Sequence, residues 1–200
     1  NEYIDIRTIL NIAYWLFDTL ALLHYHGYVH RDIKPNNIMV DDINKRFVLI
    51  DFGLTCSINN RRINHQIVCN NGEFDGTTIF MAPESFTTSF AHANMRRTNQ
   101  RRPKKILRLS GNINKLEKIK LLDIWAAGIT IYFLTENRTP WTDKFNPGLI
   151  NQIIGDYDIP FNRSSEIKDI LELALQKDHL ERLNAEFIRD YIGYVISNKY

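Results

Sequence analysis

The side chains best suited to chemistry lie in two short stretches of the chain. The first stretch, His30–Asn37 with the sequence H-R-D-I-K-P-N-N, holds a carboxylate, an amine and an amide. The second stretch, Asp51–Gly53 with the sequence D-F-G, begins 14 residues after Asn37. A carboxylate can accept a proton, and carboxylate and amide oxygens are hard ligands of the kind that Mg²⁺ prefers. These residue types suit proton transfer and magnesium binding.

Both stretches resemble motifs of the eukaryotic-type protein kinases, namely the catalytic loop H-R-D-x-x-x-x-N and the magnesium-binding D-F-G. The resemblance implies that Asp32 is the catalytic base and that Lys34 points toward the transferred phosphate. It implies that Asn37 and Asp51 bind magnesium. Lys34, Asn37 and Asp51 would then hold the cofactors ATP and Mg²⁺. A lysine two residues after the aspartate is typical of Ser/Thr rather than Tyr specificity in the family.

Each stretch also has a simpler interpretation. An aspartate and an asparagine after a helix can form a turn, but His30–Asn37 agrees with the family at eight consecutive positions. A D-F-G triplet alone is weak evidence and would usually be a turn. Here the triplet follows a β-rich run at the distance that the family requires, which favours the kinase interpretation.

The segment after D-F-G combines a familiar end with an unusual middle. Gly76–Glu84, with the sequence G-T-T-I-F-M-A-P-E, resembles the end of the kinase activation segment, where Thr77 would hydrogen-bond the catalytic aspartate. In the family, an arginine in the position of Arg31 usually contacts a phosphorylated residue of this segment. Residues 58–75 contain no Ser, Thr or Tyr, so the usual phosphate acceptor is absent.

Two further positions are expected to support the site. Asp123–Gly128, with the sequence D-I-W-A-A-G, resembles the start of the family's central buried helix. There Asp123 would accept hydrogen bonds from the backbone of the catalytic loop, and a helix N-cap is a compatible interpretation. Glu84 is expected to form a buried ion pair with Arg182. The spacing alone equally allows Arg182 to be a solvated charge on a helix.

Hydrophobic periodicity predicts the elements that must position these residues. Apolar residues at helical spacing from Ile6 to Leu23 predict an amphipathic helix that ends near Gly27. Two β-rich runs, 38–40 and 47–50, predict a hairpin between the two motifs, with its turn at 41–44. Further elements are predicted as follows: a helix buried on all sides at 121–134, helices at 147–154, 165–176 and 184–196, and a long loop at 54–75.

The predicted fold class is mainly α. It is a protein-kinase-like C-terminal lobe with a small β-hairpin that carries the catalytic loop and D-F-G, a fragment of the α+β kinase fold. The resemblance covers about residues 5–190, and we assign 1–200 to the C-lobe of a catalytic domain. The chain shows no Gly-rich phosphate loop and no V-A-I-K lysine. We therefore expect the N-terminal lobe to lie upstream, and little or no activity from these residues alone.

A basic stretch interrupts the kinase pattern. The family leaves about a dozen residues between A-P-E and D-x-W, whereas Glu84 and Asp123 are 39 positions apart, so we assign 90–120 to an insertion. Residues 94–120 hold ten Lys or Arg and one acid, a local charge of +9 in a chain of net charge +2. Such a segment could dock a partner, bind an anionic surface or direct the protein to the nucleus. The alternative is an inert, disordered loop.

Composition restricts the remaining classes. The chain is 44% hydrophobic, enough for a sizeable core, and no apolar run reaches ~18 residues, so we predict no membrane span. The two cysteines, Cys56 and Cys69, form no CxxC or Cys/His cluster. This pattern argues against a disulfide scaffold or zinc module and fits a reducing compartment. We expect Cys56 to be a small buried residue.

We expect an intracellular protein, cytoplasmic or nuclear. Abundant Ile and Asn suggest an AT-rich source such as a protist or large DNA virus, with a host-cell or virion location if viral.

The sequence is compatible with three functions. The first is a protein Ser/Thr kinase that transfers the γ-phosphoryl group of ATP to hydroxyls of a protein substrate, with Asp32 as base. The second is a pseudokinase-like docking module or an inactive fragment, but a docking module needs none of Asp32, Asn37 and Asp51. The third is a small-molecule phosphotransferase of related fold. The A-P-E motif and Lys34 favour the protein kinase.

Overall fold

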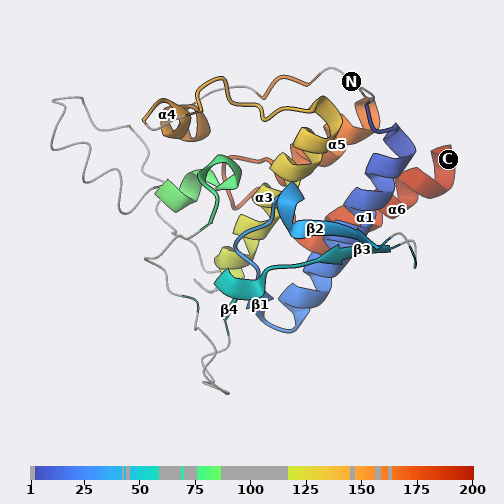
Figure 1. Ribbon diagram of the computed structural model, residues 1–200, viewed down its shortest axis with the longest axis horizontal. Coiled ribbons are helices and arrows are strands. Elements are labelled where there is room, and N and C mark those ends of the chain that lie inside the picture. The colour runs from blue at the N-terminus through green and yellow to red at the C-terminus, as the bar shows by residue number, and fades with distance from the viewer. Residues whose placement is uncertain are drawn as a thin grey trace, which may run out of the picture.

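The computed structural model describes residues 3–41, 43, 46–58, 69, 76–86, 117–144, 147–155, 159–161 and 164–200. Helices predominate in this part of the chain, and its strands form two antiparallel two-stranded sheets (Figure 1). The expectation of a mainly α fold is confirmed.

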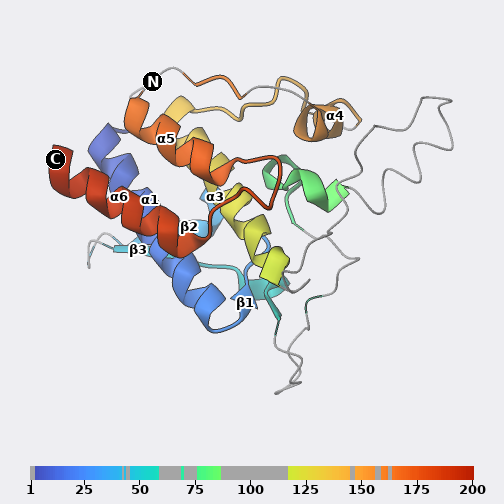
Figure 2. The same cartoon turned by 180° about the vertical axis from the view of Figure 1, so that it is seen from behind.

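Three long helices form the centre of the molecule: α1 (Ile6–Tyr25), α3 (Glu117–Glu136) and α6 (Ala185–Lys199). Helix α1 packs against both α6 and α3, and both views show α1 and α6 side by side (Figures 1 and 2). Helix α5 (Ser165–Ala174) packs on α3 and α6, and the short helix α4 (Gly148–Ile154) lies apart from the α1–α6 pair. One hydrophobic core joins these helices.

The apolar patterns explain which helix occupies which position. Helix α1 buries one stripe of residues, including Leu16 and Phe17, and leaves the opposite side exposed, as its periodicity predicts. Helix α3 is buried on all sides over residues 123–132. By length and hydropathy, α1 is the one helix among the described residues that could cross a bilayer. Its apolar stripe instead packs on α3 and α6, as in a core helix of a folded lobe.

The predicted hairpin is present, and a second small sheet accompanies it. Strands β2 (Ile38–Asp41) and β3 (Arg46–Leu49) pair antiparallel, with Ile38 opposite Leu49. Strands β1 (Tyr28–Val29) and β4 (Cys56–Ser57) also pair, although residues 54–75 were predicted to be a loop. Two-residue strands have too few positions to show an alternating pattern, so this sheet left no signal in the sequence. The described part of the chain also contains four short 3₁₀ turns: Pro35–Asn37, Phe52–Leu54, Thr78–Phe80 and Pro83–Phe86.

The C-terminal end of the predicted basic insertion, 90–120, is helical. Residues 117–120 were assigned to it, but they form the first turn of α3. Lys118 and Ile119 are buried there, and Ile119 packs with Val29, Cys56, Ile58 and Cys69. This packing extends the helix beyond the apolar run that predicted it. The rest of the insertion, 90–116, lies outside the described residues, as do 59–68 and 70–75 of the predicted loop.

The expectation for the two cysteines also needs correction. Cys56 is buried as expected, but it forms a disulfide with Cys69, with the two Cα atoms 4.9 Å apart. The Cys69 N–H donates to the Ser57 carbonyl at 2.9 Å, which brings the chain back beside β4. The contact depends on the return path of the chain, which the spacing of two cysteines does not reveal.

Candidate active site

The catalytic-loop sequence joins the two small sheets. It leaves β1 at Val29 and enters β2 at Ile38, so its side chains are held between paired strands. Arg31 has a positive φ of 72°, which L-residues rarely adopt. Gly76 approaches this turn so closely that a Cβ there would lie 2.7 Å from the Arg31 carbonyl oxygen. The glycine therefore allows Thr77 to reach the loop.

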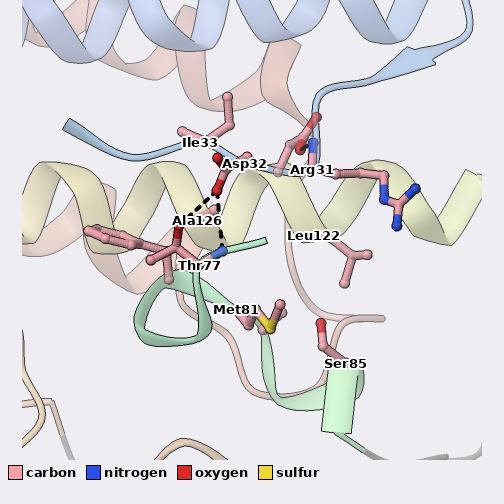
Figure 3. Close-up of a pocket in the computed structure, with 11 residues that line it drawn as sticks. Arg31, Asp32, Ile33, Thr77, Met81, Ser85, Leu122 and Ala126 are labelled. Atoms are coloured by element: carbon pink, nitrogen blue, oxygen red, sulfur yellow. Dashed lines mark hydrogen bonds between the residues drawn. The ribbon is translucent and has the colours of Figure 1, made fainter. Parts of the chain in front are cut away.

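The Asp32 carboxylate is the centre of the arrangement. It is buried and accepts hydrogen bonds from Lys34 Nζ at 2.7 Å and Asn37 Nδ2 at 3.1 Å. It also accepts one from Thr77 Oγ1 at 2.9 Å, as Figure 3 shows. The Thr77 N–H donates to it at 3.2 Å. Burial alone would raise the pKa of Asp32, but these hydrogen bonds from Lys34, Thr77 and Asn37 outweigh it and lower that pKa below its usual range. Asp32 is therefore a carboxylate at neutral pH.

Asn37 and Asp51 lie at the same end of the β2–β3 hairpin. The Ile50 N–H donates to the Asn37 carbonyl at 3.0 Å, which places Asp51 one residue beyond that contact. The Asn37 side chain is oriented by Nδ2, which donates to the Asp32 carbonyl at 2.8 Å. Asp51 is exposed, with a φ of 63°, and accepts one bond, from Gly53 N at 3.3 Å.

This pair fits a magnesium ion that is shared with phosphates. Mg²⁺ is usually held by one or two protein oxygens together with substrate phosphates and waters. Asn37 and Asp51 offer an amide oxygen and an exposed carboxylate. No group of three or more His, Cys, Asp or Glu that could hold a metal occurs among the described residues. An ion here would depend on a phosphate ligand for the rest of its coordination.

Asp123 holds the backbone of the catalytic loop. It is fully buried, and its carboxylate accepts from the backbone N–H groups of His30 and Arg31, each at 2.8 Å. The expectation of backbone donors is confirmed. Asp123 lies inside α3 and is not its N-cap, because that helix begins at Glu117. His24 Nε2 is a third contact of Asp123 at 3.0 Å, and it was not predicted because His24 belongs to no motif.

Glu84 and Arg182 form the expected buried ion pair. Arg182 donates Nη1 to one carboxylate oxygen at 2.7 Å and Nη2 to the other at 3.2 Å. The same guanidinium donates to the carbonyls of Gln176 and Leu121 and lies over the Trp125 ring, 5.1 Å from its centroid. Both partners are buried, so the alternative of a solvated Arg182 is wrong.

A small cavity of about 30 Å³ opens beside Asp32. Figure 3 shows Thr77, Met81 and Ser85 on one side of it and Leu122 and Ala126 of α3 on another. Trp141 Nε1 donates to the Ile79 carbonyl at 2.9 Å and so holds the 78–80 turn next to this cavity. Trp141 belongs to no motif, so its role was not predicted from the sequence.

The structure therefore brings the predicted site residues together in two groups. Around Asp32 it gathers Lys34, Asn37 and Thr77 in direct contact, with Asp51 next to the Asn37–Ile50 contact. A supporting layer follows, in which Asp123 holds the backbone of Arg31, and Arg182 holds Glu84.

Comparisons with known proteins agree with this geometry. The model of the protein kinase domain family matches residues 1–98. The chain is 28% identical to the bovine phosphorylase b kinase gamma catalytic chain, liver/testis isoform, over 86% of this chain and 36% of the relative. It is 30% identical to the serine/threonine-protein kinase ppk34 of Schizosaccharomyces pombe, over 84% of this chain and 39% of the relative.

A solved structure is also similar. The crystal structure of the Rad53 kinase domain and SCD2 superimposes with a TM-score of 0.63 at 19% identity, covering 95% of this chain and 57% of that chain. At this identity the likeness concerns the fold.

The chain spans between a third and two-fifths of the length of the two curated relatives.

Proposed function

Because the chain belongs to the eukaryotic-type protein kinase family, we propose that it is the C-terminal lobe of a protein Ser/Thr kinase domain. The complete enzyme transfers the γ-phosphoryl group of ATP to a hydroxyl of a protein substrate. The curated relatives are longer than this chain, which leaves room for the ATP-covering lobe that the sequence analysis expects upstream.

One observation carries the proposal, the environment of Asp32. Its carboxylate is buried and ionised, and Lys34, Asn37 and Thr77 hold it in one orientation. In the proposed mechanism Asp32 orients the attacking hydroxyl and accepts its proton. Lys34 bridges Asp32 and Thr77, with Nζ 2.7 Å and 3.0 Å from their oxygens. Its charge is proposed to stabilise the transferred phosphoryl group.

Asn37 and Asp51 are proposed to hold magnesium with ATP. The metal ion would neutralise charge on the phosphates during transfer. Asp51 suits this role because it is exposed and accepts only a single long bond from the described residues, so its carboxylate can turn toward a cation. Asn37 differs because its Nδ2 is engaged by Asp32, which leaves the amide oxygen for the ion.

The upstream lobe is proposed as the partner that covers the hairpin side of the site. Large apolar side chains are exposed there: Met39 at 54%, Val40 at 58% and Phe52 at 49%. Exposed apolar groups gathered near one site often mark an interaction surface. Phe52 already packs edge-on against His30, with 5.0 Å between ring centroids. An anionic partner at the basic insertion and an intracellular location stay predictions from the sequence.

The test is phosphate transfer by the full-length protein. With γ-labelled ATP and a mixture of Ser-, Thr- and Tyr-containing peptides, label should appear on Ser and Thr. Asp32→Asn should reduce transfer by about 10²–10⁴-fold, the typical worth of a positioned acid or base. Asp190→Asn is the matched control, because Asp190 is an exposed carboxylate on α6. Wild-type turnover in Asp32→Asn, or label mainly on Tyr, would contradict the proposal.

A further inference from the structure

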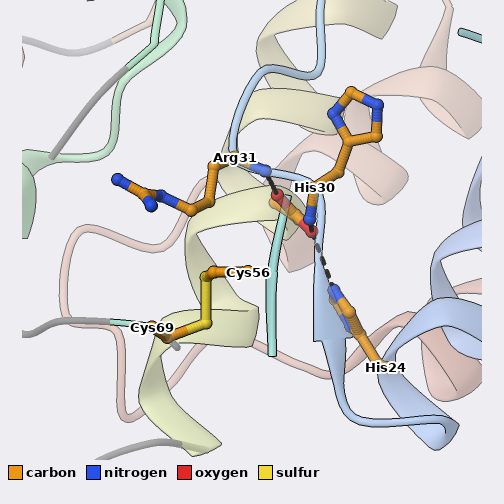
Figure 4. The surroundings of a disulfide bond; sticks show 6 residues. His24, His30, Arg31, Cys56 and Cys69 are labelled. Atoms are coloured by element: carbon orange, nitrogen blue, oxygen red, sulfur yellow. Dashed lines mark hydrogen bonds and ion pairs between the residues drawn. A yellow bond between two sulfur atoms is a disulfide. The ribbon is translucent and has the colours of Figure 1, made fainter. Parts of the chain in front are cut away.

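The Cys56–Cys69 disulfide lies at the junction of the two catalytic motifs. Cys56 follows Asp51 by five residues and lies in β4, where it pairs with Val29 of β1. Val29 precedes Arg31 by two residues. The disulfide therefore ties the chain that leaves D-F-G to the chain that enters the catalytic loop. Figure 4 shows it in one view with His30 and Arg31, whose N–H groups donate to Asp123.

The described secondary structure at this junction is short. Strands β1 and β4 are two residues each. Beside them, the described backbone bonds run from Ile58 N to the Gly27 carbonyl and from Cys69 N to the Ser57 carbonyl, both 2.9 Å. The two cysteines belong to a small apolar cluster that is separate from the main core, with Val29, Ile58 and Ile119. So small a sheet and cluster have low local stability, so a covalent bond has a large effect on them.

The composition of residues 58–75 removes one alternative restraint from that stretch. Residues 58–75 contain no Ser, Thr or Tyr, so phosphorylation of a hydroxyl cannot hold this stretch. The disulfide is the covalent link that this stretch can form with the rest of the chain, because Cys56 and Cys69 are the sole cysteines.

We propose that Cys56 and Cys69 are a reversible oxidation site, whose disulfide form holds the catalytic loop in its competent arrangement. The proposal rests on the kinase function for its activity readout alone. It assigns the oxidised form as the more active, because the described arrangement of Asp32, Lys34 and Thr77 occurs together with the closed disulfide.

The chemistry is thiol–disulfide exchange with a low-molecular-weight disulfide such as oxidised glutathione. One cysteine thiolate attacks a sulfur of the oxidant, forms a mixed disulfide and releases one glutathione thiolate. The second cysteine thiolate then attacks the protein sulfur of the mixed disulfide and releases the second glutathione. Two protein thiols are oxidised, one glutathione disulfide is reduced, and two protons leave. Both cysteines are buried, so each direction requires a local opening of β4.

The first experiment detects the bond in the full-length protein. The protein is equilibrated with a series of reduced-to-oxidised glutathione ratios, blocked with an alkylating agent and digested with trypsin. Cleavage after Arg46, Arg61, Arg62 and Arg96 places Cys56 in peptide 47–61 and Cys69 in peptide 63–96. The two peptides then stay joined only through the disulfide. We expect the joined pair to appear and disappear across the series. A pair that never forms, or that resists every ratio, overturns the proposal.

The second experiment asks what the bond does. Hydrogen exchange at the Ile58 amide should be at least about fivefold faster after reduction, and phosphate transfer should fall by a similar factor, the lower end of typical coupling between sites. A Cys56→Ser/Cys69→Ser variant should show one rate under both conditions. Unchanged exchange in the wild type, or a redox response that persists in the double variant, contradicts the proposal. If no redox state transfers phosphate, the kinase function fails, while peptide mapping and hydrogen exchange still decide the oxidation site.

Discussion

At the scale of single residues, the motifs predicted the polar contacts well. Thr77 on Asp32, the backbone donors on Asp123 and the Glu84–Arg182 pair were all expected and are all present. Each contact involves a particular residue type at a fixed position in a motif, so a sequence pattern can predict it. His24 and Trp141 were missed because each uses one ring nitrogen on a partner 62 or more positions away, and no local pattern marks such a contact.

The Glu84–Arg182 pair leads to the first prediction. Replacing one member leaves the other charge buried without its partner, which typically costs ~3–5 kcal/mol. Arg182→Leu should therefore lower the free energy of unfolding by about that amount, measured by urea denaturation. Arg189→Leu is the matched control, since Arg189 pairs with exposed carboxylates on Asp18 and Asp190 and should cost at most about 1 kcal/mol. Equal losses of unfolding free energy in the two variants would show that the buried pair contributes no more to stability than the exposed one.

At the scale of elements, the helices were predicted better than their ends. The predicted 147–154 and 184–196 correspond to α4 and α6, but α6 continues to Lys199 and α3 begins four residues before the expected apolar run. Periodicity locates the apolar middle of a helix, whereas its ends depend on caps and tertiary contacts. The β1–β4 sheet and the disulfide depend on two distant segments meeting, so the local sequence did not show them.

A surface contact between elements leads to a prediction of pH dependence. Glu166 at the start of α5 accepts from Lys199 at the end of α6, at 2.9 Å, and from Ser164 at 2.7 Å. The Lys199 and Ser164 hydrogen bonds lower the pKa of Glu166 from 4.5 to about 2. A lowered pKa in the folded state stabilises the fold above the unfolded value, and this contribution is lost as pH falls from about 4.5 toward 2.

Glu166→Gln should consequently reduce the loss of stability on acidification. We expect the urea midpoint of this variant to fall less than that of the wild type between about pH 6 and pH 3. The difference should shrink at high salt, because Lys199 is exposed and screened. Glu172→Gln serves as control, since Glu172 meets Lys168 at 3.7 Å with both side chains exposed. Identical acid responses in the two variants would argue against the Glu166 contact.

At the scale of the whole molecule, the lobe encloses one aspartate of the proposed site and leaves the other exposed. Asp32 is enclosed by Lys34, Asn37 and Thr77, whereas Asp51 and Phe52 are open. This difference predicts that substitutions of the two aspartates have different effects on phosphate transfer and nucleotide binding. In the proposed mechanism Asp32 acts on the substrate hydroxyl, so its loss should affect transfer and leave nucleotide affinity nearly unchanged. Asp51 is proposed to act through magnesium, so its loss should affect both.

The most direct test of the account compares Asp32→Asn and Asp51→Ala in the full-length protein. The measurements are the Kd for Mg–ATP by calorimetry and the rate of γ-phosphate transfer to a peptide. We predict that Asp32→Asn keeps the wild-type Kd within about twofold while losing about 10²–10⁴-fold in rate, and that Asp51→Ala weakens Mg–ATP binding and transfer together. If Asp32→Asn weakened Mg–ATP binding as much as Asp51→Ala, or kept wild-type transfer, the assignment of Asp32 as the catalytic base would be wrong.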